Sequence, residues 1–302
     1  MMMNKIGITL VSVFAAIILF SFISSPSSIK QTKALKTIII DAGHGGQDVG
    51  ARGVYSFEKD ICLAIALKVG KKMEQEFPNV KILYTRTTDV YPAIKARADF
   101  ANANKGDLFL SIHVNAAPKI RHSKFLGYRT QTYYTGKGKN RKKRTRKVPR
   151  YSVTYSNNPS NGTETYIWAA DRTDEKEKYV GSDVATEEIF DSTEYVPDMN
   201  DPEFKAKALL WTKRFFDKSY LLASLVEEEF VGEGRLSRGV KQRNEKGIWV
   251  LQATSMPSIL VETGFITHRP DEDYLNSQKG QDQIADNILN AVKKYRSATE
   301  GK

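Results

Sequence analysis

Six short apolar runs constrain the fold of this chain more than any other feature of its sequence. They are rich in Ile, Leu, Val and Tyr, and several are almost continuously apolar, which is typical of strands covered on both faces. We expect strands at Thr37–Asp41, Lys81–Thr85, Asp107–Asn115, Thr163–Trp168, Gly247–Gln252 and Ser258–Thr263. Such strands predict a sheet buried between two layers.

Helical patterns occupy the intervals between these runs. In Glu58–Phe77 the apolar residues Ile61, Ile65, Val69 and Met73 recur four apart, along one helix face. Further helices are expected at Pro92–Asn104, Lys218–Phe230 and Gln281–Arg296. Strands that alternate with helices predict a single α/β domain over residues 36–298, with a largely parallel mixed sheet flanked by helices on both faces.

The N-terminal segment differs in composition from the rest. Lys5 precedes an apolar stretch from Ile6 to about Ile23, and small polar residues with Pro26 follow. We interpret residues 1–35 as a signal peptide or an uncleaved signal anchor with a linker, and the sequence does not decide between them. Either alternative predicts export. Cys62 is the only cysteine, which excludes an intrachain disulfide and a Cys/His zinc finger.

Positive charge is concentrated in one segment. Residues 119–150 contain 13 Lys and Arg and no Asp or Glu, whereas the other residues carry 33 Lys and Arg against 35 Asp and Glu. We expect a solvated basic loop insertion over residues 119–160. Its expected contact is an anionic surface of the cell envelope; nucleic acid is not expected for an exported chain. A solvated loop with no defined partner is the alternative.

Two of the four histidines stand at the ends of predicted strands. His44 lies in "DAGHGG" and His113 lies in "FLSIHVNAA", while Glu58 opens the helix after the glycine-rich turn. The carboxyl ends of parallel strands meet at one edge of a sheet. Two histidines and a glutamate there would form a zinc site with an open coordination position. Glu262, in "PSILVETGFITH", would add a carboxylate at a strand end.

Seven stretches together resemble one known family, the zinc-dependent N-acetylmuramoyl-L-alanine amidases of the amidase-3 type. In chain order they are "IIIDAGHGGQDVGARG", "EKDICLAIA", "YTRTTD", "KARADFANANKGDLFLSIHVNAA", "GTETYIW", "RGVKQ" and "MPSILVETGFIT". They occur in the family's order and extend over about residues 36–298.

The resemblance implies that His44, Glu58 and His113 bind one catalytic Zn²⁺ ion and that Glu262 is the catalytic carboxylate. The implied substrate is peptidoglycan, cleaved at the amide between N-acetylmuramic acid and L-alanine of the stem peptide. Such cleavage serves cell-wall remodelling and daughter-cell separation. Arg86 and Arg97 also match motif positions, where we expect them to support the fold through hydrogen bonds.

Residues 170–217 interrupt the α/β pattern and look like a helical insertion. Some members of the family carry a helical segment that covers the zinc site until an activator protein displaces it. By this resemblance, Glu188 is the candidate autoinhibitory zinc ligand. A peripheral helical decoration is the alternative. Deletion of residues 175–215 should raise activity if the segment inhibits. The insertion also resembles those of periplasmic cell-division amidases, so we expect a periplasmic protein, with an inner-membrane tether if residues 1–35 are retained.

Three other functions remain open at this point. One is a polyanion-binding protein whose functional part is the basic segment 119–150. A zinc peptidase that cuts within the stem peptide would use the same metal set. A catalytically silent cell-wall-binding protein could share the fold, although it would have no need of His44, Glu58, His113 and Glu262 together.

Overall fold

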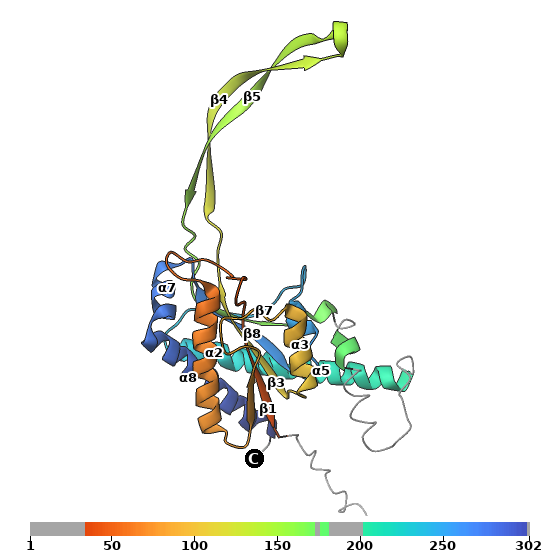
Figure 1. Ribbon diagram of the computed structural model, residues 1–302, viewed down its shortest axis with the longest axis vertical. Coiled ribbons are helices and arrows are strands. Elements are labelled where there is room, and N and C mark those ends of the chain that lie inside the picture. Colours follow the sequence, from red (N-terminus) through yellow and green to blue (C-terminus); the bar gives the residue numbers. More distant parts are fainter. Residues whose placement is uncertain (1–33, 173–175, 181–201, 301–302) are drawn as a thin grey trace, which may run out of the picture. The chain divides into compact units, whose positions relative to one another are not determined.

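The computed structural model describes residues 34–172, 176–180 and 202–300 (Figure 1). The predicted signal segment therefore lies almost entirely outside the described residues. The main sheet has six strands in the order β2-β1-β3-β8-β6-β7. They are β1 (Thr37–Ala42), β2 (Lys81–Tyr84), β3 (Leu108–Asn115), β6 (Thr163–Ile167), β7 (Ser237–Gln242) and β8 (Ser258–Phe265). All neighbours are parallel except β6 and β8, so the predicted mixed, largely parallel sheet is confirmed.

Helices cover both faces of this sheet, as predicted. They are α2 (Glu58–Glu76), α3 (Ile94–Ala103), α5 (Pro202–Gly232), α6 (Trp249–Gln252), α7 (Arg269–Asn276) and α8 (Gln278–Glu300). In β1, Ile38 and Ile40 belong to the core under α2, α5 and α8, whereas Ile39 packs with Phe109 and Leu251 on the opposite face. This division explains why the run is apolar at every position. Full burial of each such side chain contributes about 1.5–3 kcal/mol.

One predicted strand is wrong. Within residues 247–252, Gly247 has φ of 64° in a turn, a conformation that favours glycine, and Trp249–Gln252 form the short helix α6. Val250 and Leu251 are buried on this helix, so the apolar run packs as one helical face. The expected strands also omit β7, an edge strand with the largely polar sequence Ser-Arg-Gly-Val-Lys-Gln.

The basic segment is a β-hairpin rather than the predicted loop. Strand β4 (Ile120–Thr135) pairs antiparallel with β5 (Lys142–Ser156) around a short 3₁₀ turn, η1 (Gly138–Asn140). Threonine and tyrosine are frequent in both strands, β5 adds valine, and these residues favour extended backbone. The two strands form a sheet of their own (Figure 1). Almost all their side chains are at least partly exposed, so the expected solvation is correct.

The predicted helical insertion is only partly described. Residues 176–180 are helical, and α5 begins at Pro202, well before the expected helix start at residue 218. Lys176 is buried and its Nζ donates hydrogen bonds to the carbonyl oxygens of Leu251 and Thr254, which ties this short helix to the α6–β8 connection. Glu188 lies outside the described residues. Among the described helices, none is both long and apolar enough to cross a membrane.

Candidate metal centre

The turn after β1 places the first histidine. Its backbone is held by two buried arginines: Arg97 donates to the carbonyl oxygens of Ala42 and His44, and Arg86 donates to those of Ala42 and Gly43. His44 itself has φ of 57°, which is uncommon for a residue with a side chain. The expectation that both arginines support the fold is thereby confirmed.

Arg97 is neutralised by a buried carboxylate at the base of the turn. Asp41 is 1 % exposed, and its Oδ1 accepts hydrogen bonds from Arg97 Nη1 at 2.6 Å and from Thr85 Oγ1 at 2.6 Å. Ser111 Oγ donates to Oδ2 at 2.7 Å. Burial alone would raise the pKa of Asp41, but the Arg97 charge and the three hydrogen bonds outweigh it and lower the pKa.

Replacing Asp41 with alanine should therefore destabilise the fold by about 3–5 kcal/mol, because it leaves the Arg97 guanidinium buried without its countercharge. Urea denaturation measures the change. Asp99→Ala is the matched control, since Asp99 pairs with Lys95 in an exposed i,i+4 contact on α3, worth at most about 0.5 kcal/mol. Equal losses in the two variants would contradict the role given to the buried pair.

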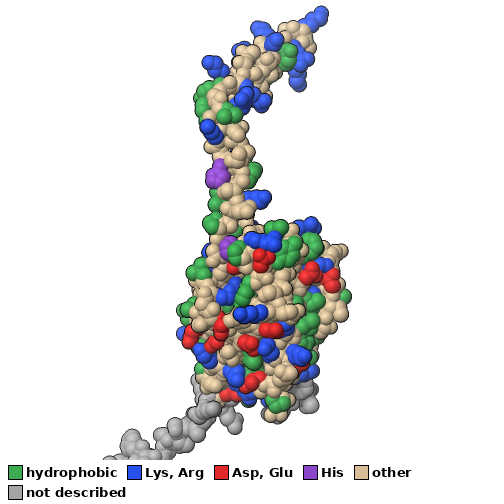
Figure 2. Space-filling model, turned by 90° about the vertical axis from the view of Figure 1, so that its left-hand side faces the viewer, with side chains coloured by type: hydrophobic (Ala, Val, Ile, Leu, Met, Phe, Trp, Pro, Cys, Tyr) green, Lys and Arg blue, Asp and Glu red, His purple; other side chains and the backbone are tan. Residues whose placement is uncertain are grey.

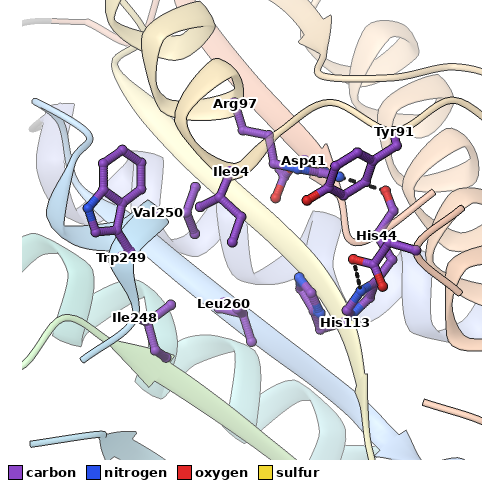
Figure 3. Close-up of a pocket in the computed structure, with 11 residues that line it drawn as sticks. Asp41, His44, Tyr91, Ile94, Arg97, His113, Ile248, Trp249, Val250 and Leu260 are labelled. Carbon is purple, nitrogen blue, oxygen red and sulfur yellow. Dashed lines mark hydrogen bonds and ion pairs between the residues drawn. The ribbon is translucent and has the colours of Figure 1, made fainter. Parts of the chain in front are cut away.

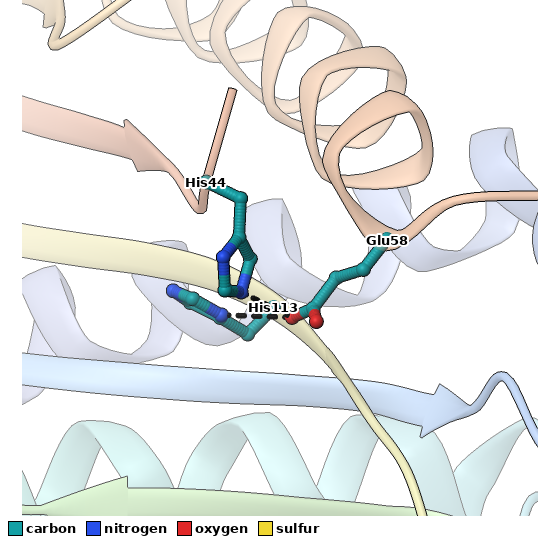
Figure 4. A group of neighbouring side chains, drawn as sticks. All are labelled: His44, Glu58 and His113. Carbon is teal, nitrogen blue, oxygen red and sulfur yellow. Dashed lines mark hydrogen bonds and ion pairs between the residues drawn. The ribbon is translucent and has the colours of Figure 1, made fainter. Parts of the chain in front are cut away.

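Three elements bring the predicted metal ligands together (Figure 4). His44 follows β1, Glu58 is the first residue of α2, and His113 lies near the end of β3. Nε2 of His44 is 3.1 Å and Nδ1 of His113 is 2.9 Å from Oε1 of Glu58, and the two imidazole rings are 4.9 Å apart. One ligand atom from each residue lies within 4.8 Å of the others.

The surroundings of the three side chains fit a bound cation. Nδ1 of His44 contacts Oδ2 of Asp48 at 2.8 Å, which leaves Nε2 to face the cluster. Oε2 of Glu58 accepts the Ala51 N–H at 2.7 Å, and this fixes the carboxylate. Burial lowers the pKa of His44, but Glu58 and Asp48 outweigh it and raise that pKa to about 9. The negative charge that favours a proton on His44 equally favours a metal ion there.

Two imidazoles and one carboxylate form a donor set that suits zinc and leaves room for a further ligand. The structure brings together the three candidate ligands that the sequence predicts. The sequence prediction did not include Asp48, which stands four residues after His44 in the same loop. A carboxylate close to a candidate histidine is the signal that could have identified it.

A second carboxylate lies beside this cluster on the neighbouring strand. Glu262 of β8 is in register with His113 of β3, and it is 8 % exposed. Its Oε2 is buried and has no hydrogen-bond partner among the described residues. Burial raises the pKa of Glu262 to about 7, although the charge of His113 opposes the change.

Glu164 of β6 is in register with Glu262, but both oxygens of its carboxylate already accept hydrogen bonds. It accepts hydrogen bonds from Asn115, Tyr166, Arg238 and Lys241. These contacts lower the pKa of Glu164 although burial would raise it. Of the two carboxylates in register, only Glu262 is thus available to exchange a proton near neutral pH.

A cavity of about 160 Å³ adjoins the cluster (Figure 3). His44 and His113 lie at one end, and Ile94, Trp249 and Leu260 supply apolar walls. Tyr179, in the short helix at residues 176–180, contacts the Trp249 ring edge-on at 6.3 Å. The helical insertion therefore begins against one wall of this cavity.

Gly43 leaves the space that the His113 ring occupies. A Cβ atom at Gly43 would come within 2.5 Å of Cε1 and Nε2 of His113. Gly43→Ala should therefore displace the ring, weaken zinc binding and destabilise the protein by about 1–3 kcal/mol. Zinc titration and thermal unfolding measure the two effects. Gly232→Ala is the control, because nothing lies within 4 Å of its Cβ position; unaltered zinc affinity in Gly43→Ala would refute the steric argument.

A family model and several individual proteins match the sequence of this chain. The family model Amidase_3, described as N-acetylmuramoyl-L-alanine amidase, matches residues 38–294. The protein YqiI of Bacillus subtilis is 29% identical over 86% of this chain and 84% of its own length. N-acetylmuramoyl-L-alanine amidase AmiC of Escherichia coli is 28% identical over 85% of this chain, which spans 52% of AmiC.

Solved structures agree with these sequence matches. The N-acetylmuramoyl-L-alanine amidase of Clostridium difficile 630 superposes with a TM-score of 0.55 at 25% identity, over 87% of this chain and 97% of that one. AmiC2 of Nostoc punctiforme gives a TM-score of 0.54 at 25% identity, over 86% and 96% of the two chains.

Proposed function

Because this chain belongs to the Amidase_3 family of N-acetylmuramoyl-L-alanine amidases, we propose that it hydrolyses the amide between N-acetylmuramic acid and L-alanine of the peptidoglycan stem peptide. His44, Glu58 and His113 would hold one zinc ion, and Glu262 would be the catalytic carboxylate. The observation that carries this assignment is the buried Glu262 carboxylate, whose Oε2 has no hydrogen-bond partner among the described residues and which is in register with a histidine of the candidate metal set.

Zinc bound at such a site is a Lewis acid, which polarises a carbonyl group and acidifies water. The chain supplies the proton transfers. With a pKa of about 7, Glu262 can take the proton of the attacking water and then deliver it to the departing alanine nitrogen. The nitrogen needs this proton because an amide anion is a very poor leaving group. Asp48 and the Ala51 N–H keep His44 and Glu58 oriented meanwhile.

Digestion of purified peptidoglycan by the zinc-loaded protein, analysed by mass spectrometry, tests this function. We expect intact stem peptides with a free L-alanine amine. Products cut within the stem peptide would favour the zinc-peptidase alternative. Absence of any cleavage by protein with one zinc bound would favour a silent wall-binding protein or an inhibited enzyme.

Inhibition by residues 170–217 remains a prediction, as does Glu188 as the blocking ligand. It is supported by the packing of residues 176–180 against α6, which bears the cavity wall residue Trp249. Replacing only residues 181–201 with a flexible linker is a sharper test than the larger deletion, since it keeps Lys176 and all of α5. Faster digestion would support inhibition; an unchanged rate in a folded variant would contradict it.

The cellular setting follows from the substrate. A peptidoglycan amidase acts outside the cytoplasmic membrane, so the protein must be exported. A periplasmic location, a membrane tether, a role in daughter-cell separation and an activator protein are further proposals, which rest on the resemblance of the insertion to those of periplasmic cell-division amidases.

A further inference from the structure

The β4–β5 hairpin has no part in the proposed hydrolysis, yet it carries most of the excess charge of the chain. Figure 2 shows Lys and Arg side chains along it, while basic and acidic side chains mix on the body of the molecule. No Asp or Glu occurs anywhere from residue 108 to residue 163. The hairpin cations therefore have no carboxylate of their own segment to pair with, and they repel one another until an anion binds.

The pairing register sorts the hairpin side chains onto two faces. Alternate residues of a strand share a face, so Lys142, Arg144, Arg146 and Arg150 of β5 lie together. Arg129 joins them, because it pairs directly with Val148 between Arg146 and Arg150. We call these five side chains the cationic face. Lys142, Arg144 and Arg146 follow one another at about 7 Å, since each residue advances the strand by about 3.4 Å. Arg150 lies about 14 Å beyond Arg146, and Arg129 of β4 stands beside the gap.

Two arginines of the cationic face are oriented by neighbours across the ladder. Arg146 donates from Nε to Oε1 of Gln131 at 2.9 Å and lies 5.5 Å from the centre of the Tyr133 ring. Arg144 donates from Nε to Oγ1 of Thr135 at 3.3 Å. Both contacts are exposed and use only the Nε–H, so the terminal N–H groups can bind an oxyanion in the forked geometry that phosphate accepts.

Aromatic side chains gather on the opposite face. Phe125 makes edge-on ring contacts with Tyr128 at 5.2 Å and with Tyr151 at 5.6 Å. The pairs Phe125–Tyr151 and Tyr128–Pro149 place these three rings away from the cationic face. We call the face of these three rings the aromatic face. The register also puts Arg121, Lys143 and Lys147 on the aromatic face and Tyr133 on the cationic face, so the two kinds of side chain are only partly sorted. The cationic face has the longer row of arginines with exposed terminal N–H groups, and a linear polymer needs only such a row.

We propose that the cationic face binds a linear polyanion of the cell envelope whose charges are phosphodiester groups, and so holds the enzyme on walls that carry such a polymer. A chain with a negative charge at every repeat can follow the row of cations along β5. The aromatic face is not required for this contact. Among the described residues, no hydrogen bond or ion pair joins the hairpin to the metal cluster or to Glu262, so binding is independent of amide hydrolysis.

The test uses the full-length protein and fluorescently labelled, lipid-free poly(glycerol phosphate), with binding followed by anisotropy at several salt concentrations. We expect affinity to fall as salt rises. The variant R129Q/R144Q/R146Q/R150Q should lose roughly tenfold or more in affinity, with a shallower salt dependence. The matched control K71Q/K81Q/K213Q/K279Q removes the same charge from exposed lysines of the body and should bind like the wild type.

Three further experiments distinguish binding of the polymer from binding of other partners and from hydrolysis. Substitution of the aromatic face, F125S/Y151S, should leave polymer binding intact, whereas its loss would point to a membrane or a partner protein. Tighter binding to phosphatidylglycerol vesicles or to single-stranded DNA than to the polymer would overturn the proposal, as would equal losses in the two four-residue variants. The cationic-face variant should hydrolyse a soluble muropeptide at the wild-type rate, so a failure here is distinct from failure of the amidase assignment.

Discussion

Glu262→Gln should lower the rate of peptidoglycan hydrolysis by roughly 10²- to 10⁴-fold, the range that a positioned acid–base group contributes. The amide side chain is nearly the same size and can neither take a proton from water nor deliver one to the leaving nitrogen. The substitution breaks no hydrogen bond at the buried Oε2, which has no partner among the described residues, so we expect the fold to be kept. Zinc content, measured by mass spectrometry of the metal, should therefore stay at one ion per chain.

Glu228→Gln is the control for this variant, since Glu228 is exposed on α5 and pairs with Lys294 far from the cluster. It should retain the wild-type rate. Near-normal turnover in Glu262→Gln would show that another group carries the proton. Glu164 would then be the next candidate despite its four hydrogen bonds, because it faces Glu262 directly across the β6–β8 pair.

His113→Ala should abolish both zinc binding and hydrolysis. The imidazole would be a direct ligand, so the loss of zinc affinity should exceed the roughly 10- to 100-fold that removal of an outer-shell partner costs. Thermal unfolding supplies a readout that needs no activity. Added zinc should raise the melting temperature of the wild type, because a ligand that binds only the folded state stabilises it, and should have no such effect on His113→Ala.

His122→Ala is the matched control, because His122 lies on the hairpin, where its Nε2 contacts only Oγ of Ser156 in an exposed pair. It should bind zinc and hydrolyse peptidoglycan like the wild type. A zinc-dependent rise in melting temperature that survives in His113→Ala would place the metal elsewhere in the chain.

Much of the central sheet could be predicted because its signals are local and strong. The candidate metal ligands could be named because they stand at strand ends and at a helix start, in stretches that together resemble one family. A run such as Ile38-Ile39-Ile40 is stable only between two apolar layers, and the structure divides those three side chains between the two cores. His44, Glu58 and His113 are 14 and 55 residues apart in sequence, yet the parallel connections return each to the same sheet edge. The strand-end position was therefore enough to bring them together.

Other features depended on partners that are distant in sequence. Residues 247–252 have the composition of a strand, but Gly247 turns the chain and the space beside Phe109 and Leu260 receives one helical turn. Strand β7 is recognisable only from its pairing with β6. A loop is predicted in place of the hairpin because the charge density of this segment is typical of solvated loops. Two strands that pair with each other satisfy their backbone hydrogen bonds without a buried face.

The place where the hairpin joins the sheet has a further consequence. Strands β3 and β6 flank β8, so the chain must cross only two strand spacings, about 10 Å, to connect them. A few residues could make that connection. The cost of closing a connection rises only with the logarithm of its length, and the inserted strands satisfy each other's hydrogen bonds. We therefore expect that the length and charge of the hairpin can change, or that it can be removed, at little cost to the sheet that carries the candidate metal ligands. The proposed polymer contact could then vary independently of the chemistry.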